Sequence, residues 1–329
     1  MIGRLPSRSA VVTIVGLLVV LAPAGVVLAD AAAPTDYEST VVSVTPPTAT
    51  IDVEVIGGDS FVQLTVAPGT EVLIEGYQQE PYLRFRTDGV VEENQRAPTT
   101  YLNASRLGGG DVPAGADPAL PPDWKQVATG GTFAWHDHRS HWMNPDPPAT
   151  ATPGDVIQSS SLAMTVDAVP VEVTFSVTWL PAPSRLPLAV GAAVGGALIL
   201  LAMFWRRRLA WPLLVVALAA LGIGWWQFSS LPTATGPLLV WWLLPAIAAA
   251  SVLIALVLGR RLVSYGLVLL AALELAAWIF VRRDGAFRAL IPTDAPFWLD
   301  RGVMAATAVV TVAAAIGATV AMWRIPAAD

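Results

Sequence analysis

All three histidines of the chain lie within the nine residues 135–143, WHDHRSHWM. Alternate residues of a strand share a face, so a strand here places His136 and His138 side by side. His141 follows where the chain turns toward Asn-Pro, and Met143 adds a thioether. Imidazole nitrogen binds copper and zinc, and histidine with methionine and no cysteine favours copper. The pattern therefore predicts a copper or zinc site made by these four side chains.

The same stretch can instead stabilise the fold. On the strand interpretation, Phe133, Trp135 and Asp137 share the other face, with the two aromatic rings toward a core. Asp137 and Arg139 would then act as neighbours of the metal ligands or form an ordinary ion pair. A network of Trp, His, Asp and Arg could hold two loops against a sheet. A triad of Ser140, a histidine and Asp137 within one strand cannot reach catalytic geometry, so no hydrolase is expected.

Composition places the chain in a membrane. Of its 329 residues, 54% are hydrophobic and only 13% are charged, which is too apolar for a soluble protein. Residues 30–185 carry twenty acidic and seven basic side chains, a net charge of −13. This excludes nucleic acid as the expected partner, because phosphate binding needs clustered Lys and Arg. Since the chain has no cysteine, thiolate metal sites and thiol catalysis are excluded.

Residues 1–29 read as a secretory signal peptide. Arg4 and Arg8 precede a long apolar run, and small residues stand before position 30. An uncleaved N-terminal anchor is the alternative, because the apolar run is long. Both interpretations place residues 30–185 outside the cytoplasm.

Residues 186–329 contain five apolar segments, each long enough to cross a bilayer about 30 Å thick. They span about 186–205, 211–228, 237–258, 262–281 and 302–323. Arginines follow the first, third and fifth segments, and the positive-inside rule puts those ends in the cytoplasm. We therefore predict a multi-pass protein of the plasma (cytoplasmic) membrane. Its N-terminal domain lies outside, its C-terminus is cytoplasmic, and the lipid bilayer is its first partner.

Glu274 is the one clearly ionisable side chain inside a predicted span. A carboxylate in the membrane is costly, so it is a functional candidate, for example in a transporter. The alternative is that it pairs with a polar group or an arginine near the outer end of the helices, or lies protonated between helices. Gly191 and Gly195 form a small-xxx-small pair that favours close helix packing.

The external domain is predicted to be all-β. The segments TIDVEVI, FVQLTV and VPVEVTFSVTW alternate apolar and polar residues, which is typical of half-buried strands. About seven such segments favour an Ig-like antiparallel β-sandwich. Two loops rich in Gly and Pro, 104–123 and 144–155, flank the histidine stretch. We expect no helix of useful length before position 186.

Four further side chains are candidates for binding. Tyr82 and Arg84 share one face of a predicted strand, and Arg96 and Tyr101 lie in a polar, aromatic stretch. They could line a groove with the histidines or form buried structural pairs. The sequence leaves both alternatives open.

The motifs EPYLRF, NQRAPTTYLN, WHDHRSHWM and VTWLPAPS occur in this order before a membrane segment. In this the chain resembles a group of actinobacterial exported membrane proteins that are labelled conserved or hypothetical. The resemblance covers roughly residues 60–185 and implies no activity. In fold class and histidine content the domain is also similar to periplasmic copper-resistance β-sandwich proteins, a likeness that implies copper binding.

Together these observations predict a non-enzymatic cell-envelope protein. Its external domain would bind a ligand, copper or zinc being the most concrete, through the histidine stretch. One alternative is a structural or assembly subunit that binds another membrane protein, with the histidines serving the fold. The other is a transporter component that uses Glu274.

Overall fold

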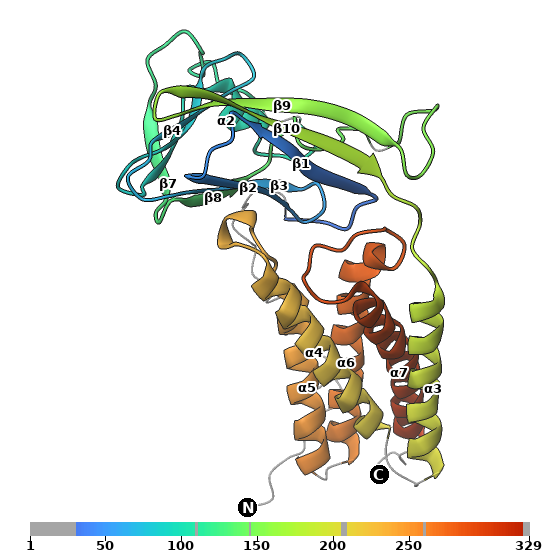
Figure 1. Ribbon diagram of the computed structural model, residues 1–329. Helices are drawn as coiled ribbons and strands as arrows, with labels where there is room; N and C mark the ends of the chain where they lie inside the picture. Colours follow the sequence, from blue (N-terminus) through green and yellow to red (C-terminus); the bar gives the residue numbers. More distant parts are fainter. Residues whose placement is uncertain (1–30, 109–110, 145, 205–208, 259–260, 325–329) are drawn as a thin grey trace, which may run out of the picture.

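The computed structural model describes residues 31–108, 111–144, 146–204, 209–258 and 261–324. An antiparallel β-sandwich stands above the ends of five long apolar helices (Figure 1). The segment predicted to be a signal peptide or anchor, residues 1–29, lies outside the described residues.

The described residues form two sheets. The larger has the strand order β1-β10-β9-β4-β5-β6-β7 and the smaller has the order β2-β3-β8, with antiparallel pairing throughout. The strands are β1 (Tyr37–Thr45), β2 (Ile51–Ile56), β3 (Phe61–Val66), β4 (Val72–Glu75), β5 (Pro81–Phe85), β6 (Val91–Asn94), β7 (Trp124–Ala128), β8 (Thr132–Trp135), β9 (Val156–Val166) and β10 (Val169–Trp179).

The predicted sandwich is confirmed, and the alternation of residue types explains it. Along β10, Val173, Phe175 and Val177 are buried against the opposite sheet, while Glu172 is exposed. The three segments with clear alternation became β2, β3 and β10. The structure has more strands than the seven expected. Strands β4, β6 and β8 have only four residues each, too few for a two-residue period to be recognised.

A short helix, α2 (Pro98–Leu102), interrupts the strands. The expectation of no useful helix in this domain missed it because it has only five residues. Pro98 occupies the first turn, where a proline costs no hydrogen bond. The buried Glu80 carboxylate accepts hydrogen bonds from the Thr99 hydroxyl at 2.6 Å and the Thr99 N–H at 3.3 Å. This carboxylate fixes the start of the helix against the sandwich.

The five predicted spans are confirmed as helices long and apolar enough to cross a membrane. They are α3 (Leu186–Phe204), α4 (Ala210–Ser230), α5 (Val240–Leu258), α6 (Arg261–Arg282) and α7 (Phe297–Trp323), with 3-10 turns η1 (Thr233–Thr235) and η2 (Arg283–Ala286) between them. Helix α7 begins at Phe297 rather than near 302. Pro296 precedes it, and Asp300 in its first turn pairs with the buried Arg282.

Helix α3 packs against α7 through small residues. A methyl group on Gly191 would lie 2.1 Å from the carbonyl oxygen of Gly302, and one on Gly195 would lie 2.8 Å from that of Ala306. Both glycines are buried. The predicted small-xxx-small pair therefore lies at a close helix crossing, where only a missing Cβ allows the backbones to approach.

The sandwich is attached directly to the helix ends. On the outer face of the small sheet, Phe61 and Ala134 share a buried apolar cluster with Leu231 and Trp241, which lie at the ends of α4 and α5. Backbone bonds between Thr35 and Leu290 add a second link. A third link is the ion pair between Arg288, in the loop before α7, and the Asp36 carboxylate just before β1, at 2.6 Å. The two parts of the chain therefore form one body (Figure 1).

Substitution of Gly191 by alanine is expected to lower the thermal unfolding temperature of the full chain in detergent. The added methyl overlaps the α7 backbone, and overpacking of this kind costs about 1–3 kcal/mol. Intrinsic tryptophan fluorescence on heating measures the change. Gly196→Ala is the matched control, because nothing lies within 4 Å of a Cβ at that position. Equal melting of the two variants would contradict close α3–α7 packing.

Candidate functional site

Strand β8 ends at Trp135, so the histidine stretch is mostly not a strand. The Ser140 N–H donates to the Asp137 carbonyl oxygen at 2.9 Å, which makes a turn directly after the strand. The expectation that His136 and His138 share one strand face is therefore wrong. The predicted alternation holds only up to His136, which stacks on Phe61 on the face opposite Trp135, with ring centroids 4.0 Å apart.

A buried ion pair between Asp137 and Arg139 lies at the centre of this turn. Arg139 Nε and Nη2 donate to the two carboxylate oxygens of Asp137, each at 2.8 Å, and the Arg139 N–H donates at 3.0 Å. The indole N–H of Trp135 adds a fourth bond at 3.1 Å. Asp137 is only 1% exposed, so every bond compensates for lost hydration.

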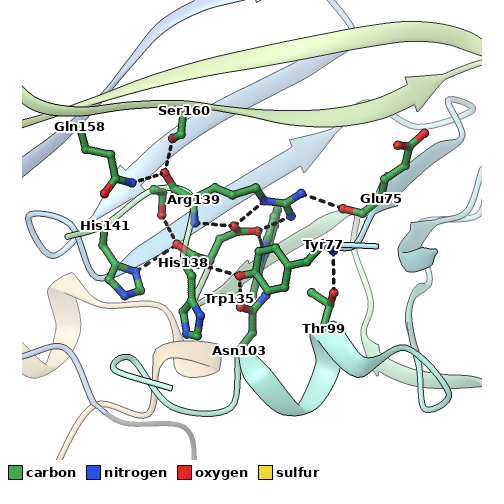
Figure 2. A network of polar contacts seen from close by, with 12 residues as sticks. Glu75, Tyr77, Thr99, Asn103, Trp135, His138, Arg139, His141, Gln158 and Ser160 are labelled. Atoms are coloured by element: carbon green, nitrogen blue, oxygen red, sulfur yellow. Dashed lines mark hydrogen bonds and ion pairs between the residues drawn. The ribbon is translucent and has the colours of Figure 1, made fainter. Parts of the chain in front are cut away.

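Arg139 connects this turn to three other parts of the sandwich (Figure 2). Its Nη1 donates to the carbonyl oxygen of Glu75 at the end of β4, at 3.0 Å. Its guanidinium lies over the Tyr77 ring, 4.9 Å from the centroid. Its own carbonyl oxygen accepts bonds from Gln158, at 3.0 Å, and from the Ser160 hydroxyl, both on β9. One residue thus joins the β4 end, the following loop and β9.

The pair remains charged. Burial by itself raises the pKa of Asp137, but the Arg139 charge and the hydrogen bonds from Arg139 and Trp135 outweigh it, so this pKa lies below its ordinary value. Burial by itself lowers the pKa of Arg139, and the Asp137 carboxylate outweighs it. Both side chains therefore keep full charge at neutral pH, and neither is a candidate for proton transfer.

Tyr77 links the turn to α2. Its hydroxyl donates to the Asn103 side-chain oxygen and accepts the His138 N–H at 2.8 Å. Its own N–H donates to the Thr99 hydroxyl at 2.9 Å. Burial, followed by the nearby Asp137 charge, raises the pKa of the Tyr77 hydroxyl. The phenol therefore stays neutral, and its hydroxyl joins the turn to Asn103 by one donated and one accepted hydrogen bond (Figure 2).

Two of the histidine rings contact backbone carbonyl oxygens on other segments. His136 Nδ1 lies 2.6 Å from the Ser60 carbonyl oxygen, and His138 Nε2 lies 3.0 Å from that of Ser105. A carbonyl oxygen only accepts, so each of these nitrogens carries the proton.

The third ring, His141, is fully buried between two carbonyl oxygens. Its Nε2 contacts the Arg106 carbonyl oxygen, and its Nδ1 lies 3.0 Å from that of Asp137. Burial, followed by the Arg106 charge, lowers the pKa of His141 to about 4. The ring is therefore neutral at pH 7 and donates its single N–H to the nearer oxygen, that of Arg106.

These contacts bear on the predicted metal site. A ring nitrogen that carries a proton has no lone pair for a metal, so the donating nitrogen of each ring, three in all, is removed as a potential ligand. Within the described residues no three His, Asp or Glu side chains are grouped so that they could hold an ion. His138 and Met143 do lie close together and half-buried. A Cβ on Gly108 would be 3.5 Å from His138 Cε1 and 3.6 Å from Met143 Cε.

The other four sandwich candidates each make contacts within the fold. Tyr82 is buried in the core at 1% exposure. Arg84 pairs with Glu92 on the adjacent strand. Arg96 Nη1 donates to a loop carbonyl 3.0 Å away, and the Tyr101 hydroxyl donates to a backbone carbonyl at 3.0 Å. These contacts are of the kind that the structural alternative requires, and a binding role for the four side chains stays a prediction.

Glu274 lies on α6 and is 9% exposed, so it faces the inside of the helix bundle. Among the described residues it makes no hydrogen bond or ion pair with another side chain. Its role in a transporter therefore stays a prediction.

Sequence reasoning missed several members of the network. No recognisable sequence spacing relates the histidine stretch to Tyr77, to Asn103 or to the buried ion pair of Asp59 with Arg106. Burial raises the pKa of Asp59, and the Arg106 guanidinium opposes this shift. Only the fold brings these side chains to the histidine stretch.

Comparison with protein-family models, curated proteins and solved structures finds no significant match.

Replacing Asp137 with asparagine is expected to destabilise the full chain by about 3–5 kcal/mol, because it leaves the buried Arg139 charge without its partner. Chemical unfolding followed by tryptophan fluorescence measures this loss. The control is Asp88→Asn, which removes a solvent-exposed partner of Arg86 and should cost less than about 1 kcal/mol. Similar losses for both variants would show that the buried pair is not a main support of the domain.

Stability of the sandwich is expected to fall as the pH drops from about 6.5 to about 4. His141 has a lower pKa in the folded state than the ordinary 6.5, so the unfolded chain binds the extra proton first. The slope should reach up to about 1.4 kcal/mol per pH unit in this window. His141→Gln should flatten the curve measured by chemical unfolding at each pH. An unchanged slope in this variant would refute the assignment.

Proposed function

We propose that the chain is a non-enzymatic assembly subunit of the cell envelope. In this proposal the external sandwich is a rigid platform that binds another membrane protein, and the WHDHRSHWM stretch holds the platform in shape. The observation that carries the proposal is that the polar groups of this stretch are hydrogen-bonded to other groups of the same domain. The Asp137–Arg139 pair and the ring contacts of all three histidines are directed to groups of the same fold.

The position of the sandwich relative to the helices supports the same function. A domain that only captured ligands could be joined by a mobile linker. Here Phe61 and Trp241 bury apolar surface between the two parts, and Asp36 pairs with Arg288. Such attachment fixes the height and orientation of the sandwich above the bilayer, which suits a protein that positions a partner.

The proposed orientation places the sandwich outside the plasma membrane and the C-terminus in the cytoplasm. The ends of α3, α5 and α7 that lie away from the sandwich are followed in sequence by arginines at 206–208, 260–261 and 324. The positive-inside rule assigns those ends to the cytoplasm.

Copper or zinc binding is the second candidate function, and one observation favours it. His138 donates through Nε2, so its Nδ1 keeps a lone pair, and a Cβ on Gly108 would contact both this ring and the end of Met143. An imidazole with a thioether is a ligand pair that suits copper.

The two candidates predict opposite results for the full chain in detergent at pH 7.4. If the stretch serves the fold, changing His136, His138 and His141 together to Gln lowers the unfolding temperature, while copper or zinc leaves that of the parent unchanged. Each buried group left unpaired costs about 1–3 kcal/mol. Calorimetric titration and thermal unfolding make the comparison. Stoichiometric copper binding that His138→Gln and Met143→Leu each abolish, with unchanged melting, would instead establish the second function.

Isolation of the protein from its native membranes in a mild detergent tests the assembly role directly. We expect native mass spectrometry to detect a membrane protein retained at fixed stoichiometry. A chain that is always recovered alone would contradict the proposed function.

A further inference from the structure

The sandwich is open along one side. Among the described residues, β1 ends the large sheet and β2 ends the small sheet, and neither has a further strand on its outer edge. These two edges flank a groove of about 460 Å³ whose base is the loop before α7. The Ser39 N–H donates to the Gly58 carbonyl oxygen at 3.0 Å and closes one end of the groove. In Figure 1 this side lies just above the helix ends.

The backbone of β2 presents unused donors to this groove. The Ala67 N–H donates to the Thr50 carbonyl oxygen, toward β2, and the Val66 N–H donates to the Gly131 carbonyl oxygen, on the side of β8. Successive N–H groups along β3 therefore point alternately toward β2 and toward β8. With the observed register, the N–H groups of Ile51, Val53 and Val55 point away from β3, toward the open edge. A free edge of this kind is a template for an added strand.

The wall of the groove on the side of the sandwich core is apolar and incompletely covered. Val41 of β1 and Val53 and Val55 of β2 pack against the main core but are only partly buried. Elsewhere in the sandwich the corresponding inward side chains, such as Leu64 and Phe175, are 0–1% exposed. An added strand would complete the burial of this side of the core.

A polar group inside the groove also lacks a partner. Ser39 lines the groove and is 5% exposed. Its hydroxyl is buried without a hydrogen-bond partner in the part of the chain that the structure describes. A buried hydroxyl left unpaired costs about 1–3 kcal/mol, a cost that a small movement of β1 toward an incoming backbone amide or carbonyl would remove.

The acidic lining of the groove favours a basic incoming strand. Glu38, Glu54 and Asp294 line the groove, and no Lys or Arg does so among the described residues. The whole segment 30–185 carries a net charge of −13. A strand with Lys or Arg on its solvent face would be attracted to this rim, and an acidic one would be repelled.

From these observations we propose that the groove between β1 and β2 binds an extended, basic segment of a partner protein by strand addition, close to the membrane surface. Strand addition takes its affinity from backbone hydrogen bonds and its specificity from alternate side chains. Here the alternate side chains would be apolar on the side of Val53 and basic on the side of Glu54. The inference rests on the assembly role proposed above and names the surface and the chemistry of the partner.

The test uses the full chain in nanodiscs and a labelled seven-residue peptide of alternating Lys and Val as the probe. Fluorescence anisotropy should detect binding that weakens with salt, and a Glu-Val peptide of the same length should bind at least tenfold more weakly. Hydrogen exchange of residues 51–55 should slow when the Lys-Val peptide is added. Equal affinity for both peptides, or unchanged exchange at this edge, would overturn the proposal.

A proline substitution separates strand addition from non-specific attraction. Val53→Pro removes an outward N–H without removing a β2–β3 bond, and we expect it to weaken Lys-Val binding at least tenfold. Val53→Thr keeps that N–H and nearly the same volume, and it should bind within threefold of the parent. Thermal unfolding of each variant checks that the fold is retained. Equal binding by the two variants would refute strand addition.

The outcomes also separate this inference from the proposed function. If the native partner is retained equally by the parent and by a folded Val53→Pro variant, the assembly role holds and the groove is the wrong surface. If neither retains a partner, the assembly role itself fails. A parent that dimerises in nanodiscs, with Val53→Pro monomeric and no peptide binding, would make a second copy the occupant and overturn the basic partner.

Discussion

The buried ion pair of Asp137 and Arg139 is the interaction on which the β-sandwich domain depends. Two opposite charges inside a protein are tolerated only if their hydrogen-bonding groups are satisfied, and here they are bonded to each other, Trp135, Glu75 and the Tyr77 ring. Removing one partner would leave the charge of the other buried without compensation, which is strongly destabilising. This requirement dictates the path of the chain after β8, because every donor and acceptor must be met where the turn places it.

The same constraint explains why histidines gather in one stretch. Each ring brings a flat surface and a nitrogen donor to a turn that crosses several segments. His136 stacks on Phe61, and His138 and His141 reach carbonyl oxygens of residues 105 and 106. Concentration of histidine in a sequence therefore has two physical causes, metal ligation and the bonding of buried backbone. At this site the contacts favour the second, and the position of His138 and Met143 beside Gly108 keeps the first as a specific alternative.

Rigid attachment to the membrane part gives the sandwich a defined direction. The small sheet faces the helix ends through Phe61 and Ala134, while the edges of β1 and β2 remain uncovered beside the loop before α7. Isolated sheets usually protect such edges, because a free edge invites pairing. An uncovered edge beside the bilayer, on a firmly held domain, is consistent with a surface kept open for a partner.

The sequence by itself determined the β-sandwich and the five membrane helices, because burial of one strand face and crossing of the bilayer both impose periods or lengths that local residue types record. It also placed the small residues Gly191 and Gly195 where helices meet. It could not place Tyr77, Asn103 and Arg106 beside the histidines, since these contacts join segments tens of residues apart. Only the tertiary structure decided what each histidine nitrogen bonds to, because hydrogen-bond partners in a turn depend on which distant carbonyl groups the fold brings within reach.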